Sequence, residues 1–341
     1  MTRTPVKEKE PGVFEVTHSR LSTFWDCSMK EYFQYRAKGV GVVSAMPYDP
    51  FIEGELGHYA LMYFHRSGRM LRANMLARVE KILDRFRPLE PETDDRIRTK
   101  LAAMVGATQG YKMRYAGDSD RYETILSEEP FEFDLGGVKV RGKLDWLAFD
   151  KKEKKTVLWE HKFLSSVNAS NYTVLPIDDQ GLIYCEGVKA LTGKYPDLKA
   201  WNFIIKSQLR RKKDKMGGKE SFLAFEARVQ QAYIEKPERF FRPPPLRVET
   251  GMVKTLKEQL LPTIERMTTE EPRMEFNCLG MYGQPCLFVQ ACTAKLQGHK
   301  DGWDAPECHG MYKIKQALHP ELERDTTEEP EKGGKKNGKK A

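Results

Sequence analysis

The sequence predicts a mixed α/β fold in which a helical front part leads into an antiparallel β-meander. Two observations support this prediction. Apolar residues recur at helical spacing from about residue 21 to residue 116. From about Thr124 the period changes to the alternation that is typical of strands. With 341 residues, 40% of them hydrophobic, the chain is long enough to bury a sizeable core as one large domain or two modest ones.

Four helical segments are expected in the front part of the chain. The first, LSTFWDCSMKEYFQYRAK (21–38), is amphipathic and rich in aromatic residues. The other three continue the apolar spacing of helices to Tyr115, and they cover 52–68, 73–87 and 95–115.

Three successive strands are expected next, at ILSEEPFEFDLGG, VKVRGKLDWLAF and TVLWEHKF. Gly136-Gly137 and the charged segment DKKEKK (150–155) supply the turns between them, so the strands form an antiparallel meander. The remaining elements mix helix and strand: a helix at 178–193, a strand at 199–207, and helices at 221–236 and 253–267.

Composition and charge narrow the class of protein. The net charge of +8 favours a polyanionic partner such as nucleic acid, although charge alone gives only nonspecific attraction. No apolar run approaches the roughly 18 to 20 residues that cross a bilayer, and the N-terminus lacks an apolar signal segment, so we expect a cytoplasmic protein away from membranes. The six cysteines would stay reduced there, and clustered cysteines suggest a metal before disulfides. No Gly-rich loop ending in GK[ST] indicates an NTP motor.

An apolar strand that ends in charged residues is the most informative stretch of the sequence. In GKLDWLAFDKKEKKTVLWEHKF (142–163), DKKEKK reads as a hairpin loop. If Phe149 faces Thr156 across it, antiparallel pairing sets Asp145 directly opposite Glu160. Like charges at such positions are destabilising, so two acids beside a core segment need a compensating cation.

The side chains after Glu160 fit a divalent metal site. Because side chains alternate across a strand, Lys162 shares the face of the two acids and His161 points to the other face. Mg²⁺ favours oxygen ligands, and a nearby lysine can hold an attacking water or an anionic substrate. A solvated surface hairpin is the alternative that geometry alone leaves open.

These residues resemble the D…ExK signature of the PD-(D/E)XK nuclease superfamily, in particular its RecB-like and Cas4-like exonuclease branch. The resemblance covers roughly residues 19 to 292 and follows the chain order of that branch. It implies a restriction-endonuclease-like core, a central mixed sheet with an antiparallel meander flanked by helices, plus a helical N-terminal region. The motifs are the cysteine-bearing helix SRLSTFWDCSMKEYFQYR, Gly54, Gly57 and His58 of GELGHYAL, Asp145 with Glu160-His161-Lys162, Gln180 and Tyr184 of QGLIYCEGV, and three C-terminal cysteines.

The resemblance implies a role for each matched residue of the metal site. Asp145 and Glu160 would bind Mg²⁺ or Mn²⁺, with the backbone carbonyl of His161 as a further ligand. His58 would be an additional ligand, where the alternative is a hydrogen-bonded core histidine. Lys162 would position the attacking water and help to deprotonate it.

Two helix residues and one acid complete the resemblance at the site. Gln180 and Tyr184, one helical turn apart, would contact the substrate backbone or hold the lysine and water. A polar helix start followed by a packed tyrosine is their alternative. Glu128 or Glu129 can match an acidic position of some members, but the strand register that decides between them is not fixed by the sequence.

The cysteines match a second feature of this branch. Several members hold a [4Fe-4S] cluster through one cysteine near the N-terminus and three near the C-terminus, here Cys27 with Cys278, Cys286 and Cys292. Four thiolates also suit Zn²⁺, and ordinary reduced thiols are the third alternative. The spacing departs from the family, because seven residues separate Cys278 from Cys286 and five separate Cys286 from Cys292. Cys308 can replace a ligand, and Cys185 is expected to be a buried small residue.

Basic residues and domain limits complete the expectations. In KSQLRRKKDK (206–215), Arg210, Arg211, Lys212 and Lys213 are expected to follow phosphates, with a solvated loop as the alternative. The expected organisation is a polar segment at 1–18, one nuclease domain at 19–315, and a disordered charged tail at 325–341. The domain would contain a helical insertion at about 65–120 and a cysteine region at about 275–310.

The expected function is therefore a metal-dependent DNA exonuclease of recombination, repair or phage replication. It would hydrolyse linear single- or double-stranded DNA in a bacterial or phage-infected cytoplasm, alone or with a separate helicase or recombination protein. The alternatives are a non-catalytic nucleic-acid-binding protein that retains the nuclease fold, and a zinc-stapled scaffold protein.

Overall fold

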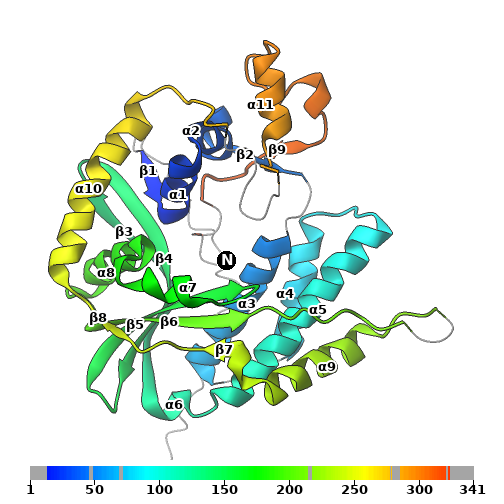
Figure 1. The fold of residues 1–341 in the computed structure, drawn as a ribbon, viewed down its shortest axis with the longest axis vertical. Helices are drawn as coiled ribbons and strands as arrows, with labels where there is room; N and C mark the ends of the chain where they lie inside the picture. Colours follow the sequence, from blue (N-terminus) through cyan, green and yellow to red (C-terminus); the bar gives the residue numbers. More distant parts are fainter. Residues whose placement is uncertain are drawn as a thin grey trace, which may run out of the picture.

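A seven-stranded mixed sheet lies at the centre of the computed structural model, which describes residues 14–45, 49–68, 72–213, 217–276, 278, 285–319 and 322 (Figure 1). The expected charged tail, 325–341, lies outside this part of the chain, as do residues 1–13. The mixed α/β fold predicted from the sequence is confirmed. The expected meander is its largest part: β3 (Tyr122–Leu135), β4 (Val138–Asp150) and β5 (Lys155–Leu164).

The other strands complete the sheet around this meander. β1 (Glu15–Thr17), inside the segment expected as polar, runs parallel to β4. β6 (Leu198–Ile205) runs parallel to β5, and it also pairs antiparallel with the short strands β7 (Phe240–Phe241) and β8 (Leu246–Arg247).

The edge of β4 opposite β3 is shared by two strands and leaves an interval between them. β1 pairs with Lys139–Arg141 of β4, and β5 pairs with Trp146–Asp150. The predicted pairing of Phe149 with Thr156 is confirmed, but the ladder ends at Trp146 and Trp159. Asp145 and Glu160 occupy the next positions of this predicted register, just beyond the last paired residues of the ladder.

The expected N-terminal helix at 21–38 is divided in the structure. α1 (His18–Asp26) ends at Cys27, which has an extended backbone, and α2 (Ser28–Glu31) begins directly after it. A π-helical turn, Tyr32–Arg36, and a 3₁₀ turn, Ala37–Gly39, follow. The buried ion pair of Arg20 with Glu31, 2.7 Å long, joins the two sides of the break. A buried charge needs a partner, so this pair favours the divided arrangement over one continuous helix.

Four helices, three from the front part of the chain together with α9 (Phe222–Glu235), cover one face of the sheet. α3 (Asp49–Ser67), α4 (Arg72–Asp84) and α5 (Pro91–Arg114) share one buried apolar cluster with α9. The one-turn helix α6 (Asp118–Arg121) connects α5 to β3.

The opposite face is covered by α8 (Asp179–Thr192), α10 (Thr250–Thr269) and α1, which pack on apolar residues of β3, β4 and β5. Between β5 and α8 the chain forms α7 (Ala169–Thr173) and a 3₁₀ turn, Leu175–Ile177. No helix in the described ranges has the length and apolar content needed to cross a membrane.

The C-terminal part forms a small module beside α2, at the top of Figure 1. It contains α11 (Val289–Leu296) and β9 (Tyr312–Ile314), and β9 pairs antiparallel with β2 (Val42–Ser44). The module therefore joins residues from both ends of the chain. Its apolar centre includes Met29, Phe33 and Phe288.

The close approach of α5 and α9 generates a prediction about stability. A Cβ atom at Gly106 would lie 2.5 Å from the backbone oxygen of Glu226, whereas one at Gly54 of α3 would meet no atom within 4 Å. Gly106→Ala should therefore lower the free energy of unfolding by about 1 to 3 kcal/mol, because helix backbone cannot move aside. Gly54→Ala, which makes the same gain in helix propensity without the clash, should raise it by up to about 1 kcal/mol. Denaturant unfolding measures both, and equal shifts would contradict the packing described here.

Candidate functional site

The candidate site lies where β4 and β5 separate. Beyond the last ladder pair, the backbone N–H of His161 donates to the Oδ2 atom of Asp145 over 2.7 Å. The carboxylate thus takes the place of the main-chain acceptor that a continuing ladder would have supplied. A buried backbone donor without a partner is costly, so this bond fixes Asp145 at the opening between the strands.

Two side chains from two other elements converge beside this carboxylate. The Nδ1 atom of His58, on α3, lies 3.3 Å from Oε1 of Glu128 and 3.3 Å from Oδ1 of Asp145. One ligand atom from each of the three residues lies within 4.8 Å of the others, an arrangement that can hold a metal ion. An imidazole nitrogen with two carboxylates is a donor set that suits Mg²⁺, Mn²⁺ or a similar divalent cation.

Glu128 was left undecided by the sequence, and the structure places it across from Asp145. Its neighbour Glu129 pairs with Leu144, so the next position along both strands brings Glu128 opposite Asp145. The second oxygen of Glu128 lies 2.7 Å from Nζ of Lys143. Lys143 is therefore a member of the site that sequence reasoning missed, and Glu128 is the acid that it could not choose over Glu129.

An irregularity in both strands explains why Glu128 faces inward. Leu126 and Phe131 contribute to the same apolar cluster although an odd number of positions separates them, and the same is true of Leu144 and Leu147. Side chains of a regular strand at odd spacing point to opposite faces, so the alternation is broken on each strand. Glu128 has a left-handed φ of 49°, which is uncommon for a residue other than glycine. Irregularities of this kind re-aim side chains beside active sites.

A second group of polar side chains lies next to the first. Nζ of Lys162 donates to Oε1 of Glu160 over 2.9 Å and also to Oε1 of Gln180. Nε2 of Gln180 donates to the same Glu160 oxygen over 2.6 Å. Lysine, glutamate and glutamine therefore form a closed triangle between β5 and α8. Tyr184, one turn further along α8, packs edge-on against Phe131.

The pKa shifts of the site reflect the concentration of negative charge. Burial and the nearby Asp145 charge raise the pKa of Glu160 to about 8. Burial opposes ionisation of Asp145 as well, but the charge of His58 and its hydrogen bond hold the Asp145 pKa below its usual value. Burial would lower the pKa of His58, yet Asp145 and Glu128 raise it well above the ordinary value. In the absence of a metal, this concentration of negative charge favours protonation of His58 and Glu160. A bound cation would balance the same negative charge.

The ring of His161 points to the opposite face of the sheet, as predicted. It stacks parallel to the ring of His65, with 5.2 Å between centroids. Burial lowers the pKa of His161 to about 4, so the imidazole is neutral. His161 therefore belongs to the site through its backbone, and its side chain belongs to the buried layer behind it.

The predicted phosphate-binding residues differ in their surroundings. Arg211 lies 2.6 Å from Asp95 at the start of α5, and its guanidinium packs over the ring of Phe222. It therefore holds the segment after β6 against the helices. The other members of the set, Arg210, Lys212 and Lys213, have exposed side chains.

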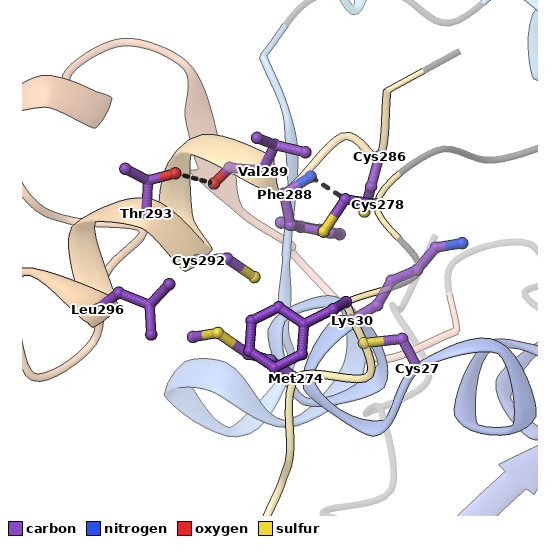
Figure 2. Close-up of a pocket in the computed structure, with 11 residues that line it drawn as sticks. Cys27, Lys30, Met274, Cys278, Cys286, Phe288, Val289, Cys292, Thr293 and Leu296 are labelled. Carbon is purple, nitrogen blue, oxygen red and sulfur yellow. Dashed lines mark hydrogen bonds between the residues drawn. The ribbon is translucent and has the colours of Figure 1, made fainter. Parts of the chain in front are cut away.

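Four cysteines surround a cavity in the C-terminal module. Figure 2 shows the thiols of Cys27, Cys278, Cys286 and Cys292 around one space, whose volume is about 100 Å³. Cys27 reaches it from the break between α1 and α2, and Cys292 from α11. The backbone N–H of Cys286 donates to the carbonyl of Cys278 over 2.8 Å, and this turn brings both residues to the cavity.

The chemistry of these thiols fits a metal centre. Burial and the neighbouring thiols raise the pKa of Cys292 to about 12, so four thiolates at one site need a cation to be stable. One ion needs only about 10 to 15 Å³ of cavity volume by comparison with a water molecule, so the space is larger than a single ion requires. Cys308 lies in a separate buried cluster with Ala294 and Ala305, and Cys185 lies on the buried side of α8, as expected.

A family model described as the PD-(D/E)XK nuclease superfamily matches residues 15–292. No curated protein matches the sequence. A solved structure titled "Crystal structure of SSO0001" is 14% identical, and the match covers 67% of this chain and 79% of that chain with a TM-score of 0.26.

The converging donors generate a prediction about metal binding. Glu128→Gln and Asp145→Asn should each weaken Mn²⁺ binding by at least about tenfold, because each removes a charged donor while preserving shape. Isothermal titration calorimetry on the metal-free protein measures the affinity. Asp150→Asn is the matched control, since Asp150 is also a buried carboxylate of β4 but pairs with Arg121 over 2.7 Å. It should lower stability and leave the affinity unchanged. Unaltered binding in both site variants would show that the metal lies elsewhere.

Proposed function

Because this chain belongs to the PD-(D/E)XK nuclease superfamily, we propose that it is a metal-dependent DNA exonuclease of the RecB-like and Cas4-like branch. Nucleases of this superfamily use divalent metals and act on nucleic acid. The observation that carries the proposal is the convergence of His58, Glu128 and Asp145 beside a lysine that Glu160 and Gln180 hold in place.

The proposed ligands are the three converging side chains together with Glu160 and the backbone carbonyl of His161. The N–H and C=O groups of one strand residue point to the same edge. The His161 carbonyl therefore faces the opening into which its N–H donates to Asp145. Mg²⁺ or Mn²⁺ held there would supply an activated water and neutralise the charge that develops on the phosphate and the leaving oxygen.

Lys162 is proposed to orient the attacking water. An ammonium group has three donors, and two of them bind Glu160 and Gln180. The third remains for a water or a phosphate oxygen. Gln180 fixes this geometry because it accepts from Lys162 and donates to Glu160, so the two charged groups cannot turn independently. Tyr184 lies on the same face of α8 as Gln180. Burial, together with the nearby charge of Glu160, raises the pKa of Tyr184.

DNA is the proposed substrate, in recombination, repair or phage replication. The net charge of +8 favours a polyanion, and the exposed Arg210, Lys212 and Lys213 are proposed to follow its phosphates. We propose that the protein acts on linear single- or double-stranded DNA in the cytoplasm. It would act alone or with a separate helicase or recombination protein. The second candidate is a nucleic-acid-binding protein that retains the fold without catalysis. The intact acids and lysine favour the enzyme.

The four cysteines are proposed to hold a [4Fe-4S] cluster, with Zn²⁺ as the alternative. A cavity of about 100 Å³ lined by four thiols supports the larger group. Among the described residues, the donor atoms that all lie within 4.8 Å of one another are those of His58, Glu128 and Asp145. The four sulfur atoms do not meet this limit, so they are spread more widely than the ligands of a single ion. The cluster would tie residue 27 to residues 278–292. It would close one nuclease domain, proposed at 19–315, that includes the insertion at about 65–120.

The catalytic proposal predicts the phenotype of Lys162→Ala. End-labelled linear and covalently closed circular DNA, single- and double-stranded, would be digested with Mg²⁺, Mn²⁺ or EDTA. The wild-type protein should degrade linear DNA only with metal. Lys162→Ala should lose at least about a hundredfold in rate, on the scale of one lost proton-transfer or charge-stabilising group. Its affinity for DNA should stay within about threefold, because one surface charge contributes little to binding.

Lys155→Ala is the matched control for this experiment. Lys155 is an exposed lysine of the same strand, so its loss changes the net charge equally and should leave the rate unchanged. Cleavage of circular DNA would replace the exonuclease by an endonuclease. DNA binding without cleavage under any metal would favour the non-catalytic candidate.

The cysteine proposal predicts which substitutions remove the cluster. Protein purified without oxygen should contain about four iron and four sulfide per chain, measured by colorimetric analysis with the visible absorption spectrum. Cys27→Ala and Cys286→Ala should each lose the iron. Cys185→Ala and Cys308→Ala, which remove thiols outside the cavity, should keep it. Zinc in place of iron in all samples would select the alternative.

A further inference from the structure

A buried polar network adjoins the metal site on the face of the sheet that α3 and α5 cover. Asn202 of β6 is the register partner of His161 on β5, and no part of its surface is exposed. Its Nδ2 atom lies 3.1 Å from Nδ1 of His161 and donates over 2.9 Å to the hydroxyl of Tyr111 on α5. The ring of His161 is thus tied to a helix that contributes nothing to the metal site itself.

Arg242 closes the network from the segment after β7. It forms an ion pair with Asp118 over 2.6 Å, donates to the hydroxyl of Tyr111, and lies 3.6 Å from the ring centroid of Tyr115. Its Nε atom faces Oδ1 of Asn202 at 3.4 Å. A guanidinium is a donor at every nitrogen, so Arg242 fixes which end of the Asn202 amide carries the oxygen.

This orientation determines the state of the His161 ring. With the amide oxygen turned to Arg242, the NH₂ group of Asn202 faces Nδ1 of His161, and that nitrogen must accept. A neutral imidazole whose Nδ1 accepts carries its proton on Nε2. Nε2 is itself buried and has no hydrogen-bond partner among the residues described. Asn202 is therefore the polar contact that fixes the ring along its plane.

Ring stacking alone does not restrain the His161 ring against movement within its own plane. The rings of His65 and Trp146 lie nearly parallel to His161, with interplanar angles of 8° and 22°. Parallel neighbours restrain a ring against tilting, but they permit sliding and rotation within its plane. The ring is attached to the peptide group whose N–H binds Asp145 over 2.7 Å. A shift within the plane would move that peptide and with it the carboxylate.

We propose that Asn202, Tyr111 and Arg242 are positioning residues of the metal site, acting through His161 on Asp145. They touch no metal donor directly, and they fix the backbone group that orients one. This inference rests on the proposed function of the site as a metal centre. Partners that orient metal ligands from behind typically change affinity or activity by about 10 to 100-fold when they are removed.

The test compares two buried tyrosines, of which only one has a hydroxyl that belongs to the network. Tyr111→Phe removes a hydroxyl that accepts from Asn202 and Arg242, whereas Tyr233→Phe removes one that donates to the carbonyl of Ile205 on the same strand. Both residues are at most 1% exposed. Mn²⁺ affinity is measured by calorimetry on the full chain, and the free energy of unfolding by denaturant. Both variants should be destabilised, but Tyr111→Phe alone should weaken Mn²⁺ binding, by about tenfold.

Asn202→Asp supplies a second, independent reading if Tyr111→Phe fails to fold. An aspartate accepts where the amide donates, so the proton of His161 should move from Nε2 to Nδ1. ¹⁵N chemical shifts of the labelled imidazole report that position, without any need for nuclease activity. A wild-type ring protonated at Nδ1, or one unchanged in Asn202→Asp, would overturn the inference.

The outcomes separate this inference from the proposed function. A wild-type protein that binds no Mn²⁺ removes the metal centre and the inference with it. If the wild type binds Mn²⁺ and the two tyrosine variants bind it equally well, the metal centre stands and the positioning role is rejected. Weaker binding in Tyr111→Phe alone, with the expected ¹⁵N shifts, supports both.

Discussion

The hydrogen bond from the His161 backbone to the Asp145 carboxylate is the interaction on which the site depends. β4 and β5 pair regularly as far as Trp146 and Trp159 and then separate. Two strands that separate inside a protein leave buried backbone groups to satisfy, and here a side chain satisfies one of them. The His161 peptide and the carboxylates of Asp145 and Glu160 are therefore held close together, although little of their surface is exposed.

The charges of the site are arranged so that each acid is held by a different element. Asp145 is held by β5, Glu128 by Lys143, and Glu160 by Gln180 of α8 with Lys162. Carboxylates this close repel one another, and burial strengthens the repulsion. Burial and the nearby charge of Asp145 raise the pKa of Glu160, and the two carboxylates beside His58 raise the pKa of that imidazole against the effect of its burial. Because no one element carries all the acids, the repulsion is distributed over the whole sheet and its covering helices, which the apolar core holds together.

The sequence predicts the regular parts of this molecule and fails where a local rule is broken. The hairpin register follows from alternation and a short charged loop, so the convergence of Asp145, Glu160 and Lys162 can be anticipated. Glu128 cannot be chosen over its neighbour, since its left-handed backbone reverses the alternation on which such a choice relies. The break at Cys27 is equally hidden, because the amphipathic pattern continues through it and only the distant partners of that cysteine give it a reason. In each case the exception lies at one of the two candidate sites, and local irregularity is commonly retained at functional sites.

The helix α1 gives the two centres a common structural element. Its first residue, His18, lies 3.2 Å from Asp179, the residue before Gln180 on α8. Its C-terminal cap is Cys27, which lines the cysteine cavity. A nine-residue helix is a stiff rod of about 13 Å, and the buried Arg20 fixes it to Glu31 beyond the break. The position of α1 is therefore determined jointly by the thiols at one end and by the start of α8 at the other. Gln180 in turn aligns Lys162 with Glu160. A continuous series of contacts therefore runs from the cysteine module through α1 and α8 to the lysine of the site.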